Sequence, residues 1–158
     1  MEYTSGSIGR VFAARFRDGE DVYAGIEAIA RREEIASAVV LAVGGARRGP
    51  VVVGPRETTG RIEPMLREFD DARELVAVGT IHPADGRPSL HLHAGIGRGD
   101  EALVGCPRLG LETFLVLEVF ILEVAALDAD RRVDPSSGLK LLAFADAVKV
   151  DLDREADS

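Results

Sequence analysis

The sequence predicts one α+β domain: a large, mostly antiparallel β-sheet of seven to nine strands with one main α-helix over residues 19–35. Three observations lead to this prediction. The length of 158 residues suits a single domain that buries its own core. Short segments that alternate apolar and polar residues, separated by turn residues, recur along most of the chain. Only one segment repeats its apolar residues with a helical period.

The expected helix follows an acidic turn in the stretch RDGEDVYAGIEAIARREEI. Asp18 and Asp21 resemble a capping pair, and carboxylates at this end also interact favourably with the helix dipole. Val22, Ile26 and Ile29 recur at intervals of three or four residues, so they share one side of a helix. We therefore expect an amphipathic helix with one apolar face.

The expected strands are short and bounded by turn residues. Gly44-Gly45 ends one of them in a turn, and Pro64 confines another to a sheet edge or a bulge. We expect the last segment to close the sheet and an acidic tail over residues 146–158 to follow the domain. The expected strands cover residues 10–16, 37–46, 49–54, 61–68, 74–83, 90–96, 102–107, 113–127 and 139–144.

The hairpin LHLHAGIGRGDEALVGC holds two of the three histidines and the only cysteine. His91 and His93 are two residues apart on a strand, so their side chains lie on the same face, about 7 Å apart. If the hairpin loop has four residues, Gly97 pairs with Ala102, and His93 stands opposite Cys106. Two imidazoles and a thiolate suit Zn²⁺, although the set also accepts Co²⁺, Ni²⁺ or Cu. Three protein ligands leave a fourth position open.

Other interpretations of these residues stay open. A slip of one residue in the hairpin turns Cys106 to the other face of the sheet. The two histidines then form a packed or solvent-facing pair, and Cys106 is a small buried hydrophobic residue. His82 could approach the same site, although a role in stabilising a turn, or exposure to solvent, fits its position before Pro83 better.

Charge and cysteine content restrict partners and location. The net charge is −8, which opposes direct binding to DNA. A single cysteine and no signal-peptide pattern favour the cytoplasm. The longest apolar stretch contains Glu118 and Glu123 and is too short to span a membrane. Three arginine doublets fit a solvated surface better than phosphate contacts: Arg31-Arg32, Arg47-Arg48 and Arg131-Arg132.

Two long stretches resemble a known family. They are RFRDGEDVYAGIEAIARREEIASAVVLAVGGARRGPVV and AVGTIHPADGRPSLHLHAGIGRGDEALVGCPRLGLETFLVLEVFI. The G-E-D that opens the helix, the G-x-I, the LHLHAGI and the later E-V-x-I resemble the PPC domain, the plant and prokaryote conserved domain, also called domain of unknown function 296. The resemblance covers residues 8–145.

The resemblance implies a metal site and an assembly. In that family the H-x-H is typically followed by G-G-H-L; here Val104-Gly105 replaces the two glycines, and Cys106 stands at the third histidine. The implied metal ligands are therefore His91, His93 and Cys106, with a thiolate in place of an imidazole. The family also implies a homotrimer. Its fold is similar to that of acetolactate decarboxylase, which holds a zinc ion through H-x-H and a later histidine.

The resemblance also implies what the protein does. Plant members carry AT-hooks and act in DNA-bound regulators, whereas this chain has no AT-hook, which favours protein partners over direct contact with DNA. We expect a small metal-binding homotrimer with a binding or regulatory, DNA-associated role. One alternative is a metal-dependent lyase or hydrolase acting on a small molecule, with Asp100, Arg108 or Glu118 assisting. The other is a metal-free structural oligomer.

Overall fold

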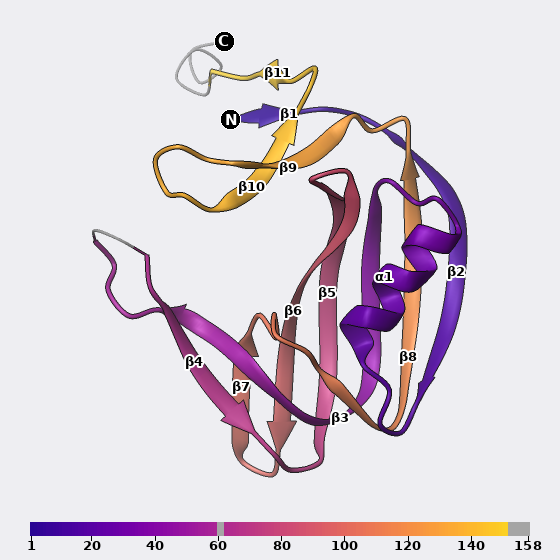
Figure 1. The fold of residues 1–158 in the computed structure, drawn as a ribbon, viewed down its shortest axis with the longest axis vertical. Coiled ribbons are helices and arrows are strands. Elements are labelled where there is room, and N and C mark those ends of the chain that lie inside the picture. Colours follow the sequence, from indigo (N-terminus) through magenta and orange to yellow (C-terminus); the bar gives the residue numbers. More distant parts are fainter. Residues whose placement is uncertain (60–61, 152–158) are drawn as a thin grey trace.

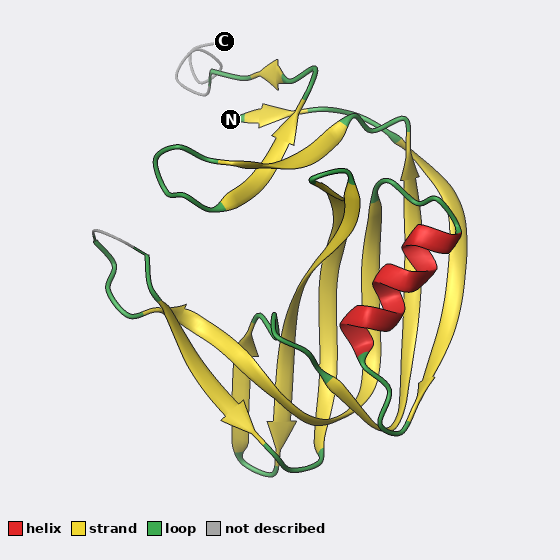
Figure 2. Cartoon of the chain, in the orientation of Figure 1, coloured by secondary structure: helices red, strands yellow, loops and turns green. Residues whose placement is uncertain are grey.

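The computed structural model describes residues 1–59 and 62–151, and it forms one domain with a central antiparallel sheet and a single helix on one face of it (Figures 1 and 2). The predicted fold class is confirmed. The elements are β1 (Glu2–Tyr3), β2 (Ser7–Arg17), α1 (Val22–Arg32), β3 (Ala38–Pro55), β4 (Pro64–Phe69), β5 (Arg73–Ala84), β6 (Arg87–Arg98), β7 (Glu101–Gly105), β8 (Glu112–Ala125), β9 (Ala129–Val133), β10 (Lys140–Phe144) and β11 (Val148–Lys149).

The main sheet has seven strands. Its order is β2-β8-β3-β5-β6-β7, and β4 pairs with the outer part of β3. Every pairing in it is antiparallel. Consecutive strands β5, β6 and β7 are neighbours, so this side of the sheet is built from two hairpins. The hairpins position the histidines and the cysteine.

The core lies between the sheet and α1. Along β6, four alternating residues are buried, from Leu90 to Ile96, and they face the helix side. On α1 the residues Val22, Ile26 and Ala30 are buried, as the helical spacing predicts. The helix begins at its N-cap Asp21, whose Oδ1 accepts a hydrogen bond from the Ala24 backbone N–H at 2.8 Å. Among the described helices none is long and apolar enough to cross a membrane.

The expected turn at Gly44-Gly45 is wrong. β3 runs unbroken through both glycines, so the expected strands 37–46 and 49–54 are one strand of 18 residues. The register against β8 shifts between the two glycines, where Leu115 and Val116 form a bulge. A Cβ on either glycine would overlap a carbonyl oxygen of β8. These glycines therefore permit a close approach of two strands and not a chain reversal.

The C-terminal part also differs from the expectation. Segment 139–144 does not close the main sheet, because β10 pairs with β9 in a separate two-stranded sheet. Near it, β11 pairs with β1, so the two ends of the described chain lie together (Figure 1). Of the expected tail, residues 152–158 lie outside the described residues, as does Arg61 at the start of another expected strand.

Candidate functional site

The β6–β7 hairpin has the register that the sequence predicts. Gly97 pairs with Ala102, and the pairing continues to Ala94 with Gly105. His91 and His93 lie on the face of β6 opposite its buried leucines. The prediction that both imidazoles share one face is therefore confirmed.

The chain leaves the sheet directly after this pairing. The backbone N–H of Cys106 donates to the Val52 carbonyl, and the Cys106 carbonyl accepts from the Val52 N–H in return, both at 2.9 Å. Gly105 permits the crossing, because a Cβ there would overlap the Val52 carbonyl oxygen. In the described part of the chain β7 pairs with β6 only from Ala94 onward, so the edge of β6 over residues 89–93 is open to side chains.

Three side chains meet at this open edge. The ligand atoms of His91, His93 and Cys106 all lie within 4.8 Å of one another, the one such group among the described residues. The two Nε2 atoms are 3.1 Å apart. Two nitrogens bound tetrahedrally to one zinc ion at 2.0–2.1 Å are separated by about 3.3 Å. The donor set and its spacing therefore fit a tetrahedral transition metal.

The surroundings keep His91 in the form that binds a metal. Burial, and then the positive charges of Arg131, His93 and Arg108, lower the pKa of His91 to about 4. His91 is therefore neutral at physiological pH, as a ligand must be. Cys106 is only 2% exposed. The Tyr23 hydroxyl is buried beside it, and burial, followed by the charge of Cys106, raises the pKa of Tyr23.

Of the auxiliary residues suggested by the sequence, Arg108 alone reaches this place. Its Nε donates to Cys106 Sγ at 3.3 Å, which puts a positive charge beside the sulfur. Glu118 is exposed on β8, and Asp100 lies in the turn between β6 and β7. His82 is neither exposed nor part of the cluster: it is 5% exposed, and its Nδ1 lies 3.1 Å from the Ser37 hydroxyl.

Arg131 is a site residue that sequence reasoning missed. The expectation of a solvated doublet is wrong for it, because its guanidinium is half-buried and donates to Thr80 Oγ1 at 2.9 Å. Its neighbour Arg132 is exposed, as alternation along β9 requires. The β9–β10 hairpin crosses the end of β5 (Figure 1), and this contact between distant segments brings Arg131 to Thr80. No pattern in the local sequence predicts it.

A cavity of about 460 Å³ lies against this cluster. Its walls come from α1, β6, the segment after β7 and the β9–β10 hairpin, and they include His91, Cys106, Arg108 and Arg131. Cavities of this size accept small molecules. The site therefore joins a metal-binding donor set to an adjacent space.

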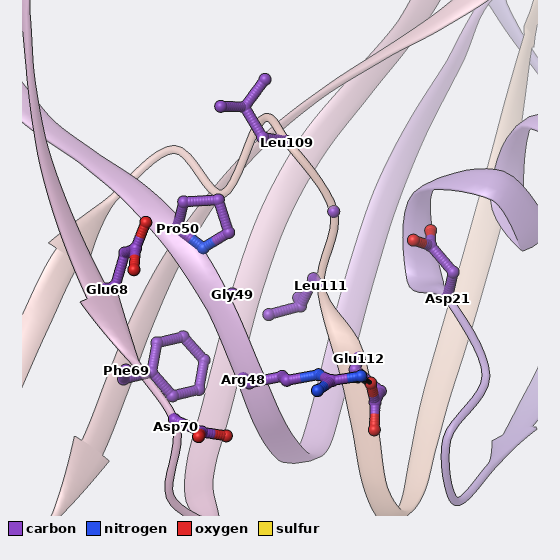
Figure 3. Close-up of a pocket in the computed structure, with 11 residues that line it drawn as sticks. Asp21, Arg48, Gly49, Pro50, Glu68, Phe69, Asp70, Leu109, Leu111 and Glu112 are labelled. Atoms are coloured by element: carbon purple, nitrogen blue, oxygen red, sulfur yellow. Dashed lines mark hydrogen bonds and ion pairs between the residues drawn. The ribbon is translucent and has the colours of Figure 1, made fainter.

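A larger cavity of about 510 Å³ lies elsewhere, between β3, β4 and the segment before β8. Figure 3 shows the Arg48 guanidinium beside Glu112, with which it pairs at 2.7 Å, while Leu109 points away. None of the described residues that line it is a histidine or cysteine. Arg48 is the one cationic residue among the described residues that line the larger cavity, and it is paired with Glu112. The larger cavity therefore has fewer groups free to bind a ligand than the smaller cavity.

Comparison with known proteins decides the family. The family model of the Plants and Prokaryotes Conserved domain matches residues 3–125. The chain belongs to this family. No curated protein matches the sequence. The strands β9, β10 and β11 follow the matched range, so Arg131 lies outside the residues that the family model matches.

Solved structures share the fold. A metal-containing protein from Archaeoglobus fulgidus is 24% identical with a TM-score of 0.81, over 90% of this chain and 99% of its own. A PPC protein from Pyrococcus horikoshii is 22% identical with a TM-score of 0.79, over 91% and 98%. A proposed DNA-binding protein from Ralstonia eutropha JMP134 is 25% identical with a TM-score of 0.72, over 84% and 90%. Likeness at this level supports the arrangement of the strands.

Proposed function

We propose that this PPC protein is a metal-binding homotrimer in which His91, His93 and Cys106 hold one zinc ion. The observation that carries the metal site is the convergence of these ligand atoms within 4.8 Å at an open strand edge. Zinc fits best because two imidazoles and one thiolate form a mixed donor set that suits a borderline-soft ion. When bound, the ion supplies Lewis-acid chemistry at the wall of the cavity. The Archaeoglobus relative, described as metal-containing, supports the proposal.

Zinc content and affinity test the metal site. The purified, untagged protein should contain about one zinc per chain. Cys106→Ser should lower zinc affinity at least about tenfold, because a hydroxyl is a poor zinc ligand. The matched control is Ala102→Ser, at an exposed position of the same hairpin. Unchanged zinc affinity in C106S would show that Cys106 is not a ligand. A wild-type protein that takes up no zinc would contradict the metal site and favour the metal-free structural oligomer.

The trimer is supported by the face of the sheet that α1 does not cover. Across four strands, Phe120, Leu41, Val78 and His93 are aligned in one row. Leu41 is 42% exposed and Val78 56% exposed. A contiguous apolar surface of this kind marks a contact with another protein chain, and a second copy is the partner that the family implies. One free cysteine that must stay reduced to bind metal supports a cytoplasmic location.

The role we propose is binding or regulation, with DNA association through a partner protein. Two structural relatives are described as proposed DNA-binding proteins. The net charge of −8 favours a protein intermediary. The cavity beside the metal ligands supports a second candidate, a metal-dependent lyase or hydrolase acting on a small molecule. Zinc-dependent turnover of a small substrate would favour this candidate, and capture of a DNA-bound protein would favour the first.

A further inference from the structure

The cavity beside the metal ligands is rich in positive charge. Arg108, Arg131 and Lys140 all line it, in a protein whose net charge is −8. Burial, and then the positive charge of nearby Arg108, lower the pKa of Arg131. These positively charged side chains repel one another at this distance. A negative charge in the cavity would offset the repulsion.

The described residues do not fully supply this negative charge. Arg108 donates to the Cys106 sulfur and Arg131 to the Thr80 hydroxyl, and neither has a described carboxylate within ion-pair distance. The Nε atom of Arg131 is buried and has no hydrogen-bond acceptor among the described residues. A buried donor without an acceptor destabilises the folded protein. Arg131 lines the cavity, so an anion bound there would pair with the charge of its guanidinium.

The acidic groups near the cavity are engaged elsewhere. Asp85 pairs with Lys140 at 2.5 Å. Glu27 is part of the wall, but its Oε1 accepts from the Leu90 backbone N–H at 3.1 Å, and its Oε2 lies 3.8 Å from Arg31 on the same helix. The two arginines therefore remain the groups that an incoming anion would meet.

We propose that this cavity binds a small organic carboxylate, held by Arg108 and Arg131, with its carbon chain against Leu139 and Leu141. The guanidinium fork matches a carboxylate in shape and number of donors. The two leucines line the same cavity and offer an apolar wall, which a bare inorganic anion would not use. The contact with the arginines stands by itself, whereas the position of the ligand beside a metal rests on the proposed function.

The experiment is a titration of the full chain with sodium butyrate, followed by ¹H–¹⁵N NMR of the arginine Nε–H groups and by calorimetry. Butyrate should shift the Nε–H signal of Arg131. Arg131→Met should weaken binding at least about tenfold, because a charge-assisted pair is lost. Arg131→Lys should restore part of the affinity, since the charge returns without the fork. The matched control is Arg132→Met, which removes an exposed arginine from the next position of β9 and should leave binding unchanged.

Several outcomes overturn the inference. Equal affinity in R131M and wild type does so, and so does binding of butanol as tight as that of butyrate. Inorganic phosphate binding more tightly than butyrate would show an anion site without the apolar contact. If R131M fails to fold, as its spectrum would reveal, R131K and Arg108→Met give the same test.

Titrations of zinc-loaded and EDTA-treated protein separate this inference from the metal site. Zinc uptake without butyrate binding overturns the carboxylate cavity and leaves the metal site. Butyrate binding in a protein that takes up no zinc overturns the metal site and leaves the carboxylate cavity. Tighter butyrate binding with zinc present supports a ligand that lies next to the ion.

Discussion

At the scale of single residues, the environment of His91 is what makes the site suited to a metal. Burial is the largest cause of its lowered pKa, and the neighbouring cations add to it. The unfolded chain takes up this proton near the ordinary pKa of 6.5, whereas the folded protein takes it up only near 4. Between those pH values the unfolded state binds more protons, so a falling pH favours unfolding.

We therefore expect the metal-free protein to lose stability as the pH falls from 6.5 towards 4, with His91 as one cause. Ring signals in an NMR titration of EDTA-treated protein should show His91 neutral until close to pH 4. His91→Gln should flatten the dependence of the melting temperature on pH without abolishing it, because burial also lowers the pKa of His82. An ordinary midpoint near 6.5 for His91 would contradict this account.

Gly105 is the second decisive residue, because it lets the chain cross to Val52 and bring Cys106 to the histidines. Gly105→Ala should lower the free energy of unfolding by about 1–3 kcal/mol, the usual cost of overpacking, and should weaken zinc binding as well. Gly95→Ala is the control, since its Cβ would have 4.0 Å to the nearest backbone atom. Chemical denaturation and a zinc titration measure the two effects. Equal stability of the two variants would mean that the crossing tolerates a side chain.

At the scale of elements, α1 covers the buried face of the sheet. The helix begins at a single N-cap residue, Asp21. Asp21→Ala should destabilise the protein by about 1 kcal/mol, because the Ala24 N–H loses its acceptor. Asp21→Asn should keep most of that stability, since an amide oxygen also accepts. Urea unfolding measures both, with Asp146→Ala, at an exposed position before β11, as the control. A similar loss in the alanine and asparagine variants would assign the effect to charge and not to the cap.

At the scale of the whole molecule, we expect the proposed assembly to form through the face of the sheet that α1 does not cover. Leu41→Glu should convert the proposed trimer to monomers, because it places a charge in the row formed by Phe120, Leu41 and Val78. Light scattering after gel filtration measures the mass. Leu109→Glu is the control, as this side chain is exposed outside that face. A trimer that persists in L41E would place the contact on another surface.

The sequence by itself determined the features that depend on neighbours along the chain. Alternation along β6 set which residues are buried and placed His91 and His93 on one face, because strand side chains have a period of two. The hairpin sequence was compatible with the register that brings Cys106 towards His93, and the resemblance to the PPC domain favoured that register over a slip of one residue. The helix and its cap at Asp21 follow from equally local signals. Most of the sheet and all of the candidate metal ligands could therefore be predicted.

Only the tertiary structure decided what depends on packing between distant segments. The sequence predicts a turn at Gly44-Gly45, but in the structure the two glycines lie within one long strand, opposite a bulge in β8 that approaches them closely. The sequence predicts that Arg131 is a solvated surface residue, but the β9–β10 hairpin places it beside Thr80, 51 residues away in the sequence. The charged cavity forms where the β9–β10 hairpin meets α1 and β6. Strand pairing fixes local faces, while burial and long-range contacts fix which faces come together.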